Sequence, residues 1–435
     1  MSHREHFEDG SVLHVEPAPG LPLVSFNVSF RTGGTWDPPG KDGLLRMMLR
    51  LMRRGTRALD ANEIDERIDR LGAEVSVEVA PTSATLHAQV VARNLDPFVE
   101  LIAELLAEPA FAPDELERLR RESEAELHEA RDNDRGLVNL WFRRAVFAGH
   151  PYERSAYGRL SSLPAIDEAA IRDAHRAVVR RGNAVVGVSG AIDVEQARAL
   201  HRQLLARLPM GEPPPVDLPE PSDPPGRRLI FVDKPERTQT QVLIGRLGTH
   251  AHDADHTALS LANTAFGGTF TARLMQEVRA KRGWSYGAYA RLSIDRRRHA
   301  FSMWTFPAAE QVAECIQLQM RLWRDFHAKG ISQRELRFFR NYLTRSYAFE
   351  IDTAQKRLGQ AMDLDLLELP PDYYSHYLER LAAVTVEQAN QAVAQRLDPA
   401  SCRVVVVGTA ESTLDGVRGA LDGLDRADVV SFEED

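Results

Sequence analysis

"SVLHVEPAPGLPLVSFNVSFRTGGT", residues 11–35, contains two runs of alternating apolar and polar residues on either side of a Pro/Gly turn. A second stretch, "RRLIFVDKPERTQTQVLIGRLGT" at 227–249, repeats this plan around a polar turn. Such alternation is typical of strands with one buried face, and the turns predict a β-hairpin at the start of each half. Both stretches end in Gly-Thr, and a second Gly-Thr follows after an apolar helix, with a period of about 213 residues. This period is too long for a solenoid and indicates a duplicated domain.

A proline-rich segment separates the two halves. Residues 209–225, "PMGEPPPVDLPEPSDPP", contain eight prolines among acidic and small residues. Proline cannot continue a helix, so this composition favours an extended, semi-rigid strap. We therefore predict an N-terminal domain at 1–208, a linker at 209–226 and a C-terminal domain at 227–435.

The later segments of the two halves also correspond. Runs of strands are followed by runs of helices, which indicates α+β domains with helices layered on a sheet. Two such domains joined by a strap are expected to form a shell with a concave face. The predicted elements are a capped amphipathic helix at 60–72, first-half strands at 73–80, 83–92 and 183–192, and second-half strands at 285–294, 299–306 and 401–410.

Composition excludes several classes of partner. The net charge of −9 and the pI near 5.9 give no basic footprint for nucleic acid or for an anionic membrane. The sequence has no run of about 18 apolar residues that could span a bilayer. The N-terminus "MSHREHFEDG" is polar and acidic, unlike a signal peptide, so we expect a cytoplasmic location.

The sequence has two cysteines, Cys315 and Cys402, which are too few for a disulfide framework. We predict that both are buried thiols.

The first apolar helix carries an unusual pair of charges. "GLLRMMLRLMRRGT", residues 43–56, places Arg46 and Arg50 four positions apart on one helical face, where like charges repel. One explanation is that both arginines extend from an amphipathic surface helix toward water. A second explanation rests on a resemblance to a known family, carried by residues 266–290.

The stretch "FGGTFTARLMQEVRAKRGWSYGAYA", residues 266–290, resembles a signature of the insulinase, pitrilysin and mitochondrial processing peptidase family, the inverted zincins. Segments at 147–163, 233–242 and 369–390 extend this resemblance over essentially the whole chain. The family has duplicated α+β halves, each a mainly antiparallel sheet with helices on one face, and two halves form half of a clamshell. The resemblance implies the same architecture here.

The family's metal-binding helix has the form G-L-x-H-x-x-E-H-x-x-x-x-G-T, which aligns without a gap to residues 43–56. Its three catalytic positions fall on Arg46, Leu49 and Arg50, and its third metal ligand falls on Glu126. A guanidinium has no lone pair to give a metal, and Leu49 has no proton-accepting group. The resemblance therefore implies a degenerate metal site, and we expect this chain to bind no metal itself.

A second family motif is retained, because Arg279 and Tyr286 match an arginine and a tyrosine spaced seven apart. The resemblance implies that Arg279 holds a substrate carbonyl and Tyr286 stabilises the oxyanion. The pattern predicts a helix ending near Gly283 and a strand beginning at Tyr286. The alternative is a solvated arginine and a core tyrosine. Gly267 and Gly268 either bind an extended substrate, by resemblance, or serve only turn geometry.

Some bacterial members of this family are heterodimers in which one subunit carries His-x-x-Glu-His and the other only the arginine and tyrosine. The chain resembles the second kind: inactive alone, with zinc in a homologous partner subunit and an unfolded peptide as substrate. A homodimer of the isolated chain is left open. The alternative is a non-catalytic assembly subunit resembling the core proteins of the respiratory bc1 complex. The histidine-rich stretch "THAHDADH", residues 249–256, is interpreted as a solvated loop rather than a metal site.

Overall fold

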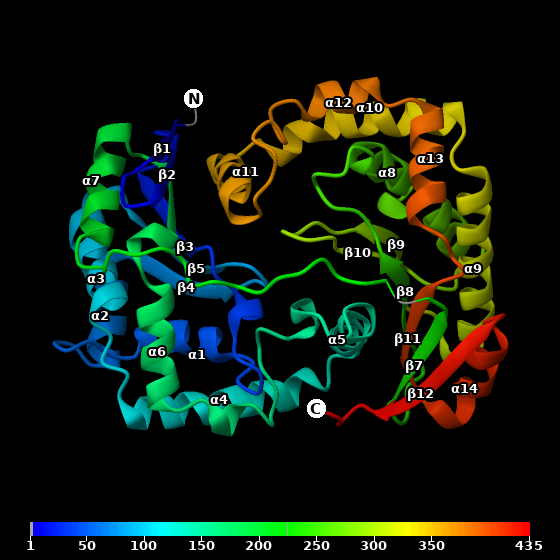
Figure 1. The fold of residues 1–435 in the computed structure, drawn as a ribbon, viewed down its shortest axis with the longest axis horizontal. Helices are drawn as coiled ribbons and strands as arrows, with labels where there is room; N and C mark the ends of the chain where they lie inside the picture. The colour runs from blue at the N-terminus through cyan, green and yellow to red at the C-terminus, as the bar shows by residue number, and fades with distance from the viewer. Residues whose placement is uncertain (1–2, 224) are drawn as a thin grey trace. The chain divides into compact units, whose positions relative to one another are not determined.

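The structure, a computed structural model, describes residues 3–223 and 225–435. Contacts divide the chain into two compact units, each built on one six-stranded sheet (Figure 1). The first unit comprises residues 1–127, 154–217 and 348–369, and the second comprises 128–153, 218–347 and 370–435. The predicted domains 1–208 and 227–435 each supply all strands of one sheet, and one helical segment of each is assigned by its contacts to the other unit.

The first unit contains six strands in the order β1-β2-β6-β3-β5-β4, and all neighbours are antiparallel except β2 and β6. Its strands are β1 (His3–His6), β2 (Val12–Pro17), β3 (Leu23–Phe30), β4 (Ala73–Val79), β5 (Ala84–Val91) and β6 (Ala184–Gly190). Its helices are α1 (Leu44–Met52), α2 (Ala61–Leu71), α3 (Leu95–Ala107), α4 (Pro113–Ala130), α6 (Glu168–Val178), α7 (Val194–Leu205) and α11 (Ala354–Leu366).

The second unit repeats this plan in the order β12-β7-β11-β8-β10-β9, with β7 parallel to β11 and to β12. Its strands are β7 (Arg227–Asp233), β8 (Gln241–Leu247), β9 (Ala288–Leu292), β10 (Ala300–Thr305), β11 (Cys402–Gly408) and β12 (Leu424–Ser431). Its helices are α5 (Asp134–Val146), α8 (His256–Asn263), α9 (Val312–Lys329), α10 (Gln333–Glu350), α12 (Tyr377–Ala383), α13 (Val386–Arg396) and α14 (Ala410–Gly419), with π-helical segments η6 (Thr264–Gly268) and η7 (Met275–Ala280).

The prediction of an α+β chain with two similar, mainly antiparallel halves is confirmed, but the predicted opening hairpins are wrong. Strand β6 lies between β2 and β3, and β11 lies between β7 and β8. The physical reason is burial, because β11 is buried along its whole length and β6 along all but its last residue. Strands covered on both faces belong at the centre of a sheet. The chain returns at the end of each half to fill that central place.

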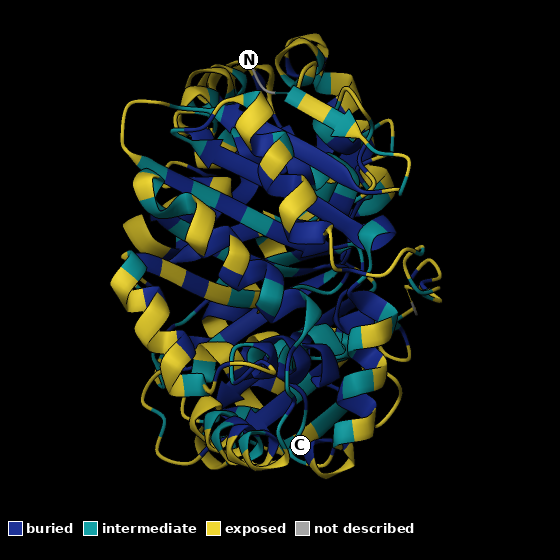
Figure 2. Ribbon diagram, turned by 90° about the vertical axis from the view of Figure 1, so that its left-hand side faces the viewer, coloured by how far each residue is buried: buried dark blue, intermediate teal, exposed yellow. Residues whose placement is uncertain are grey.

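Local signals gave most element boundaries correctly. Helix α2 has the predicted cap, since the Asp60 carboxylate accepts from the Glu63 N–H and the Glu63 side chain accepts from the Asp60 N–H. Figure 2 shows dark blue strands beneath helices that alternate between buried and exposed along their length, as amphipathic helices do. Residues 209–223, within the predicted strap, contain neither helix nor strand.

One helix in each unit packs on the sheet face opposite the main helical layer, which the prediction of helices on one face did not include. Helix α11 lies on β6 and β2, where Leu358 and Met362 form a small separate apolar cluster with Val185. A Cβ on Gly187 would lie 2.2 Å from the Met362 Sδ, so only glycine permits this approach. Helix α5 lies on β8 and β11 in the second unit in the same way.

Lys234 anchors helix α5 to the second sheet. Its buried ammonium donates to the Arg131 carbonyl at 2.7 Å and to the Asp134 carboxylate at 2.7 Å, at the start of the helix. We expect Lys234→Met to reduce the free energy of unfolding by about 2–3 kcal/mol, because a half-buried carboxylate and a carbonyl lose their donor. Urea denaturation of the variant beside Lys329→Met, whose lysine forms only an exposed i,i+4 pair, measures this loss. Equal stability of the two variants would contradict the anchoring role.

No helix within residues 3–223 and 225–435 is long and apolar enough to cross a membrane. Cys315 and Cys402 are both free and buried, as predicted. Burial raises the pKa of the Cys315 thiol to about 11, which keeps it protonated and unreactive at neutral pH.

Candidate functional site

Helix α1 is fixed at its start by a buried carboxylate. The Gly43 N–H donates to the Asp37 Oδ2 at 2.8 Å, and the Leu45 N–H donates to the Asp37 Oδ1 at 3.1 Å. Burial raises the pKa of Asp37 to about 7, although these two hydrogen bonds oppose the shift. Gly43 has a φ of 93°, and a Cβ there would lie 2.9 Å from the Gly158 Cα, so glycine is required at this entry.

Most of helix α1 is buried in the core of the first unit. Leu49, the position aligned with the family's catalytic glutamate, is fully buried among apolar side chains. Arg46 and Arg50 instead face helix α4, with about a fifth of each side chain exposed. The simple explanation, two arginines extending toward water, is therefore wrong.

The two arginines share one carboxylate. The Arg46 Nη2 donates to the Glu126 Oε2 at 2.9 Å, and Arg50 reaches both Glu126 oxygens, at 3.1 Å from its Nη1 and at 2.8 Å from its Nη2. Arg50 also lies 3.6 Å from a Glu122 oxygen, and Arg54 pairs with that same carboxylate. Alternating charges on α1 and α4 thus remove the like-charge repulsion that the sequence presents.

The positions of the predicted degenerate metal site do come together, since the structure places Glu126 against Arg46 and Arg50. The two guanidinium groups place positive charge next to Glu126, where a metal ion would also place it. They have no lone pair with which to coordinate a metal ion. Within residues 3–223 and 225–435 no group of three or more His, Cys, Asp or Glu side chains could hold a metal, the 249–256 loop included.

Sequence reasoning missed Arg54 and Glu122, although a signal was present. Arg54 lies four residues after Arg50, and Glu122 lies four residues before Glu126. These spacings repeat the charge pattern of Arg50 and Glu126, with Glu122 on α4 and Arg54 two residues beyond the end of α1. The Arg46 guanidinium also stacks 4.5 Å from the centroid of the Tyr157 ring, which holds it in place.

These ion pairs should make the stability of the first unit depend on pH. The hydrogen bond from Arg54 lowers the pKa of Glu122 below its ordinary value. A depressed pKa contributes stability above the unfolded pKa, about 4.3, and that stability is lost as the pH falls through the folded value. Because Glu122 is about a third exposed, we expect the contribution to be a few tenths of a kcal/mol. Urea midpoints of Glu122→Gln and the parent chain should differ at pH 7 and converge near pH 3; a constant difference would contradict this prediction.

The second predicted motif lies at the surface of the second unit. Tyr286 is 76% exposed, so the alternative of a core tyrosine is wrong. Arg279 is exposed on η7, and its guanidinium lies 5.4 Å from the centroid of the Phe270 ring. The predicted helix end is confirmed, since Gly283 has a φ of 67° and its N–H donates to the Arg279 carbonyl at 2.9 Å.

The predicted start of the following strand is wrong by two residues. Strand β9 begins at Ala288, and Tyr286 lies before it in a bend. The Ser285 hydroxyl donates to the Gly287 carbonyl at 2.6 Å and accepts from the Phe306 N–H, which ties this bend to the end of β10. The side chain of Tyr286 is therefore presented by a fixed bend and not by the strand itself.

Gly267 and Gly268 differ in their surroundings. Gly267 is buried, and a Cβ on it would lie 2.6 Å from the Ala290 backbone nitrogen in β9, so close packing requires glycine there. Gly268 is exposed, and its nearest contact would be the Thr264 side chain at 3.3 Å. Neither glycine has a positive φ, so the explanation by turn geometry does not apply.

The structure thus combines a duplicated α+β fold with arginine–glutamate pairs at the positions that the family resemblance assigns to the metal site. The family model described as "Insulinase (Peptidase family M16)" matches residues 15–159, and the one described as "Peptidase M16 inactive domain" matches residues 165–343. Together the matches cover well over half of the sequence, and the chain belongs to the insulinase, or M16 peptidase, family.

Individual relatives agree with this assignment. The chain is 26% identical over 400 residues to an uncharacterized zinc protease of Mycobacterium leprae, covering 88% of this chain and 86% of that protein. It is 21% identical over 373 residues to a protein of Helicobacter pylori named a non-peptidase homolog, covering 85% of each. The crystal structure of a peptidase M16 inactive domain from Pseudomonas fluorescens has the same fold, with a TM-score of 0.86, 24% identity and coverage of 95% of this chain and 99% of that one.

Proposed function

We propose that this chain is the non-zinc-binding subunit of a heterodimeric zinc metallopeptidase and that it contributes Arg279 and Tyr286 to peptide hydrolysis. The observation that carries the proposal is the contrast between the two motifs. Arginine–glutamate pairs close the metal site on α1, whereas the arginine and the tyrosine of the other motif remain exposed at a surface.

The exposure of Tyr286 supports a role toward another molecule. Burial of a large aromatic side chain stabilises a folded protein. Holding Tyr286 at 76% exposure in a hydrogen-bonded bend therefore adds nothing to stability. Arg279 likewise keeps its N–H groups free of any carboxylate among the described residues, with only the Phe270 ring beside it. Both groups are therefore available as donors.

The proposed chemistry uses these donors on a peptide bond held by a second, homologous subunit with His-x-x-Glu-His. Arg279 holds a substrate carbonyl, and the Tyr286 hydroxyl donates to the oxygen on which negative charge develops. Zinc in that partner subunit supplies Lewis acidity and an activated water. Leu49 cannot serve as a base and Arg46 and Arg50 cannot bind a metal, so the isolated chain is inactive in this proposal.

The alternative is a non-catalytic assembly subunit, and the name of the Helicobacter pylori relative, a non-peptidase homolog, is compatible with both readings. An assembly subunit has no need of Arg279 or Tyr286. Both residues keep the spacing of the family motif and are exposed, which favours the catalytic role.

We propose the cytoplasm as the location, with two free thiols as the support. We also propose that Gly267 and Gly268 lie next to the substrate backbone.

The test is a mixing experiment. This chain, a homologous His-x-x-Glu-His subunit from the same genome and an equimolar mixture are assayed for cleavage of an unstructured fluorogenic peptide. We expect cleavage only in the mixture, with loss on chelation. Light scattering of this chain alone shows whether it forms a homodimer, and co-purification of the mixed subunits on a tag carried by one of them shows the heterodimer. Equal activity of the zinc subunit alone would refute the proposal.

A further inference from the structure

A hollow of about 340 Å³ lies on the open face of the second sheet, beside helix α5, and no motif of the sequence pointed to it. Its floor comes from strands β8, β9 and β10 and its wall from α5. The lining residues are Arg135, Asn139, Leu243, Tyr289, Arg291, Ser302 and Trp304. All of them belong to the second unit, so this site is complete within it.

The alternation of the strands builds the floor. Tyr289 pairs with Trp304 across the β9–β10 ladder, and Arg291 pairs with Ser302 two residues further on. Because side chains two apart share a face, all four point away from the apolar core on the other side. Phe301 and Met303, at the intervening positions, lie in that core.

Helix α5 supplies the wall, and its position is fixed. Arg135 and Asn139 lie one helical turn apart on the same face. The Arg135 guanidinium lies 4.2 Å from the centroid of the Trp304 ring, whose Nε1–H donates to the Gln241 Oε1 at 2.9 Å. A planar guanidinium on a held aromatic ring keeps its N–H edge free for a ligand.

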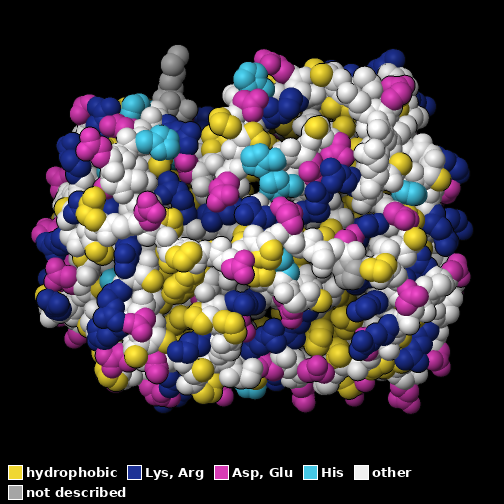
Figure 3. Space-filling model, viewed as in Figure 1, with side chains coloured by type: hydrophobic (Ala, Val, Ile, Leu, Met, Phe, Trp, Pro, Cys, Tyr) yellow, Lys and Arg dark blue, Asp and Glu magenta, His cyan; other side chains and the backbone are white. Residues whose placement is uncertain are grey.

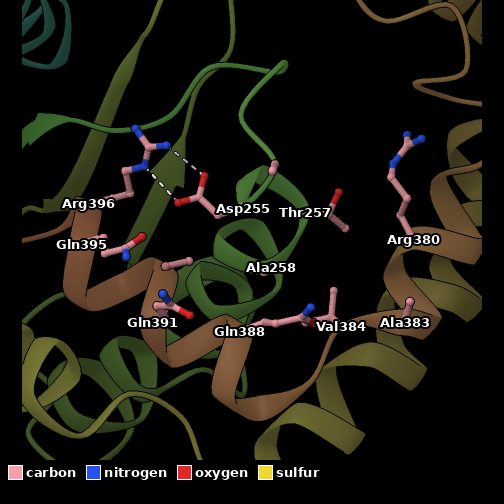
Figure 4. A pocket seen from close by; sticks show the side chains of 12 residues that line it. Asp255, Thr257, Ala258, Arg380, Ala383, Val384, Gln388, Gln391, Gln395 and Arg396 are labelled. Carbon is pink, nitrogen blue, oxygen red and sulfur yellow. Dashed lines mark hydrogen bonds and ion pairs between the residues drawn. The ribbon is translucent and has the colours of Figure 1, made fainter.

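The charge of the hollow is unbalanced. Two arginines line it, no carboxylate does, and neither Arg135 nor Arg291 forms an ion pair with any described residue. On the face of the molecule seen in Figure 3, by contrast, basic and acidic side chains are interspersed. Both arginines that line the larger hollow at α12 and α13 are paired, because Arg396 binds both oxygens of Asp255, at 2.9 and 3.1 Å (Figure 4), and Arg380 lies 3.3 Å from an Asp372 oxygen.

We propose that this hollow binds an acidic side chain of an extended peptide, with its carboxylate between Arg135 and Arg291. The planar guanidinium groups match a carboxylate, and the Ser302 hydroxyl adds a donor. The Asn139 amide nitrogen donates to the Arg135 carbonyl at 2.6 Å, which leaves its oxygen to accept from a peptide N–H. Tyr289 and Trp304 offer aromatic surface to the flanking residues.

A row of aromatic rings joins the hollow to the Arg279 region. Trp304 stacks on Tyr289 with ring centroids 6.3 Å apart, Tyr289 meets Phe270 edge to face at 6.0 Å, and Arg279 lies over Phe270. One extended peptide can therefore follow this row. Peptide binding to the hollow does not depend on the proposed function. The further inference that the bound peptide is a substrate, selected for an acidic residue, rests on the proposed function.

The test is calorimetric titration of the full-length chain with an acetylated and amidated hexapeptide that contains one glutamate among alanine and leucine. We expect binding that weakens as the salt concentration rises and that is lost when glutamine replaces the glutamate. The same glutamine peptide with a free C-terminus distinguishes a side-chain carboxylate from a terminal one. Binding that needs a free terminus, or preferential binding of a short single-stranded oligonucleotide, would overturn the proposal.

Three variants connect the binding to the hollow. Arg135→Gln and Arg291→Gln should each weaken peptide binding about tenfold, because each removes a charge-assisted hydrogen bond. Arg418→Gln, on the exposed surface of α14, removes the same charge in the same unit and should leave the affinity unchanged. Equal weakening in all three variants would overturn the assignment. The titration needs no zinc subunit. Peptide binding can therefore be absent while the mixture cleaves peptide, and binding can be present while the mixture is inactive.

Discussion

Tyr286→Phe is expected to lower kcat of the mixed complex by about 10²–10³-fold, with little change in KM. The substitution removes a single hydroxyl, and loss of one oxyanion donor costs about this much in other enzymes. Because Tyr286 is 76% exposed and its ring is retained, the fold and the association of the subunits should not change.

Steady-state kinetics of the reconstituted pair measure this effect, and a matched variant controls for the loss of a hydroxyl as such. Tyr342→Phe alters another exposed tyrosine, on α10, and should leave kcat unaltered. An unchanged kcat in Tyr286→Phe would show that the oxyanion is stabilised elsewhere. It would also favour the alternative, a non-catalytic assembly subunit.

The double substitution Arg46→His, Arg50→His is expected to convert this chain into a stoichiometric zinc-binding protein. Glu126 already lies within 3.1 Å of both guanidinium groups, so the third ligand of a two-histidine, one-carboxylate set is in position. A histidine side chain is shorter than an arginine side chain. The substitution therefore leaves room beside Glu126 for a zinc ion with bonds of about 2 Å. The ion then replaces the positive charge that the guanidinium groups carry in the parent chain.

Metal content after dialysis measures the gain, with Arg46→Gln, Arg50→Gln as a control that loses the same charge. Adding Glu126→Gln to the histidine variant should abolish tight binding, and acidification should release the metal as the imidazoles protonate. Hydrolysis should still be absent, because Leu49 stays in the core and provides no base. A histidine variant with no more zinc than the glutamine control would refute the interpretation of this helix as a former metal site.

Features that depend on neighbours in the chain are the ones that the sequence predicts correctly. The capping box at Asp60, the left-handed Gly283 and the alternating strands all follow from interactions between residues close in sequence. The predicted hairpins failed because the strand that separates β2 from β3 is contributed some 150 residues later. Its near-complete burial decides the order, and burial on both faces has no period-two signature.

The sequence by itself determined the duplication, the α+β class and the loss of metal ligands, since a guanidinium cannot coordinate a metal in any fold. Only the tertiary structure decided which groups the two arginines bind, because Glu126 and Glu122 reach them from a helix about 70 residues further along the chain. The same holds for the arginine-lined hollow beside Trp304, whose wall and floor come from opposite halves of the sequence. Contacts between distant segments carry no local periodicity, so they become visible only once the chain has folded.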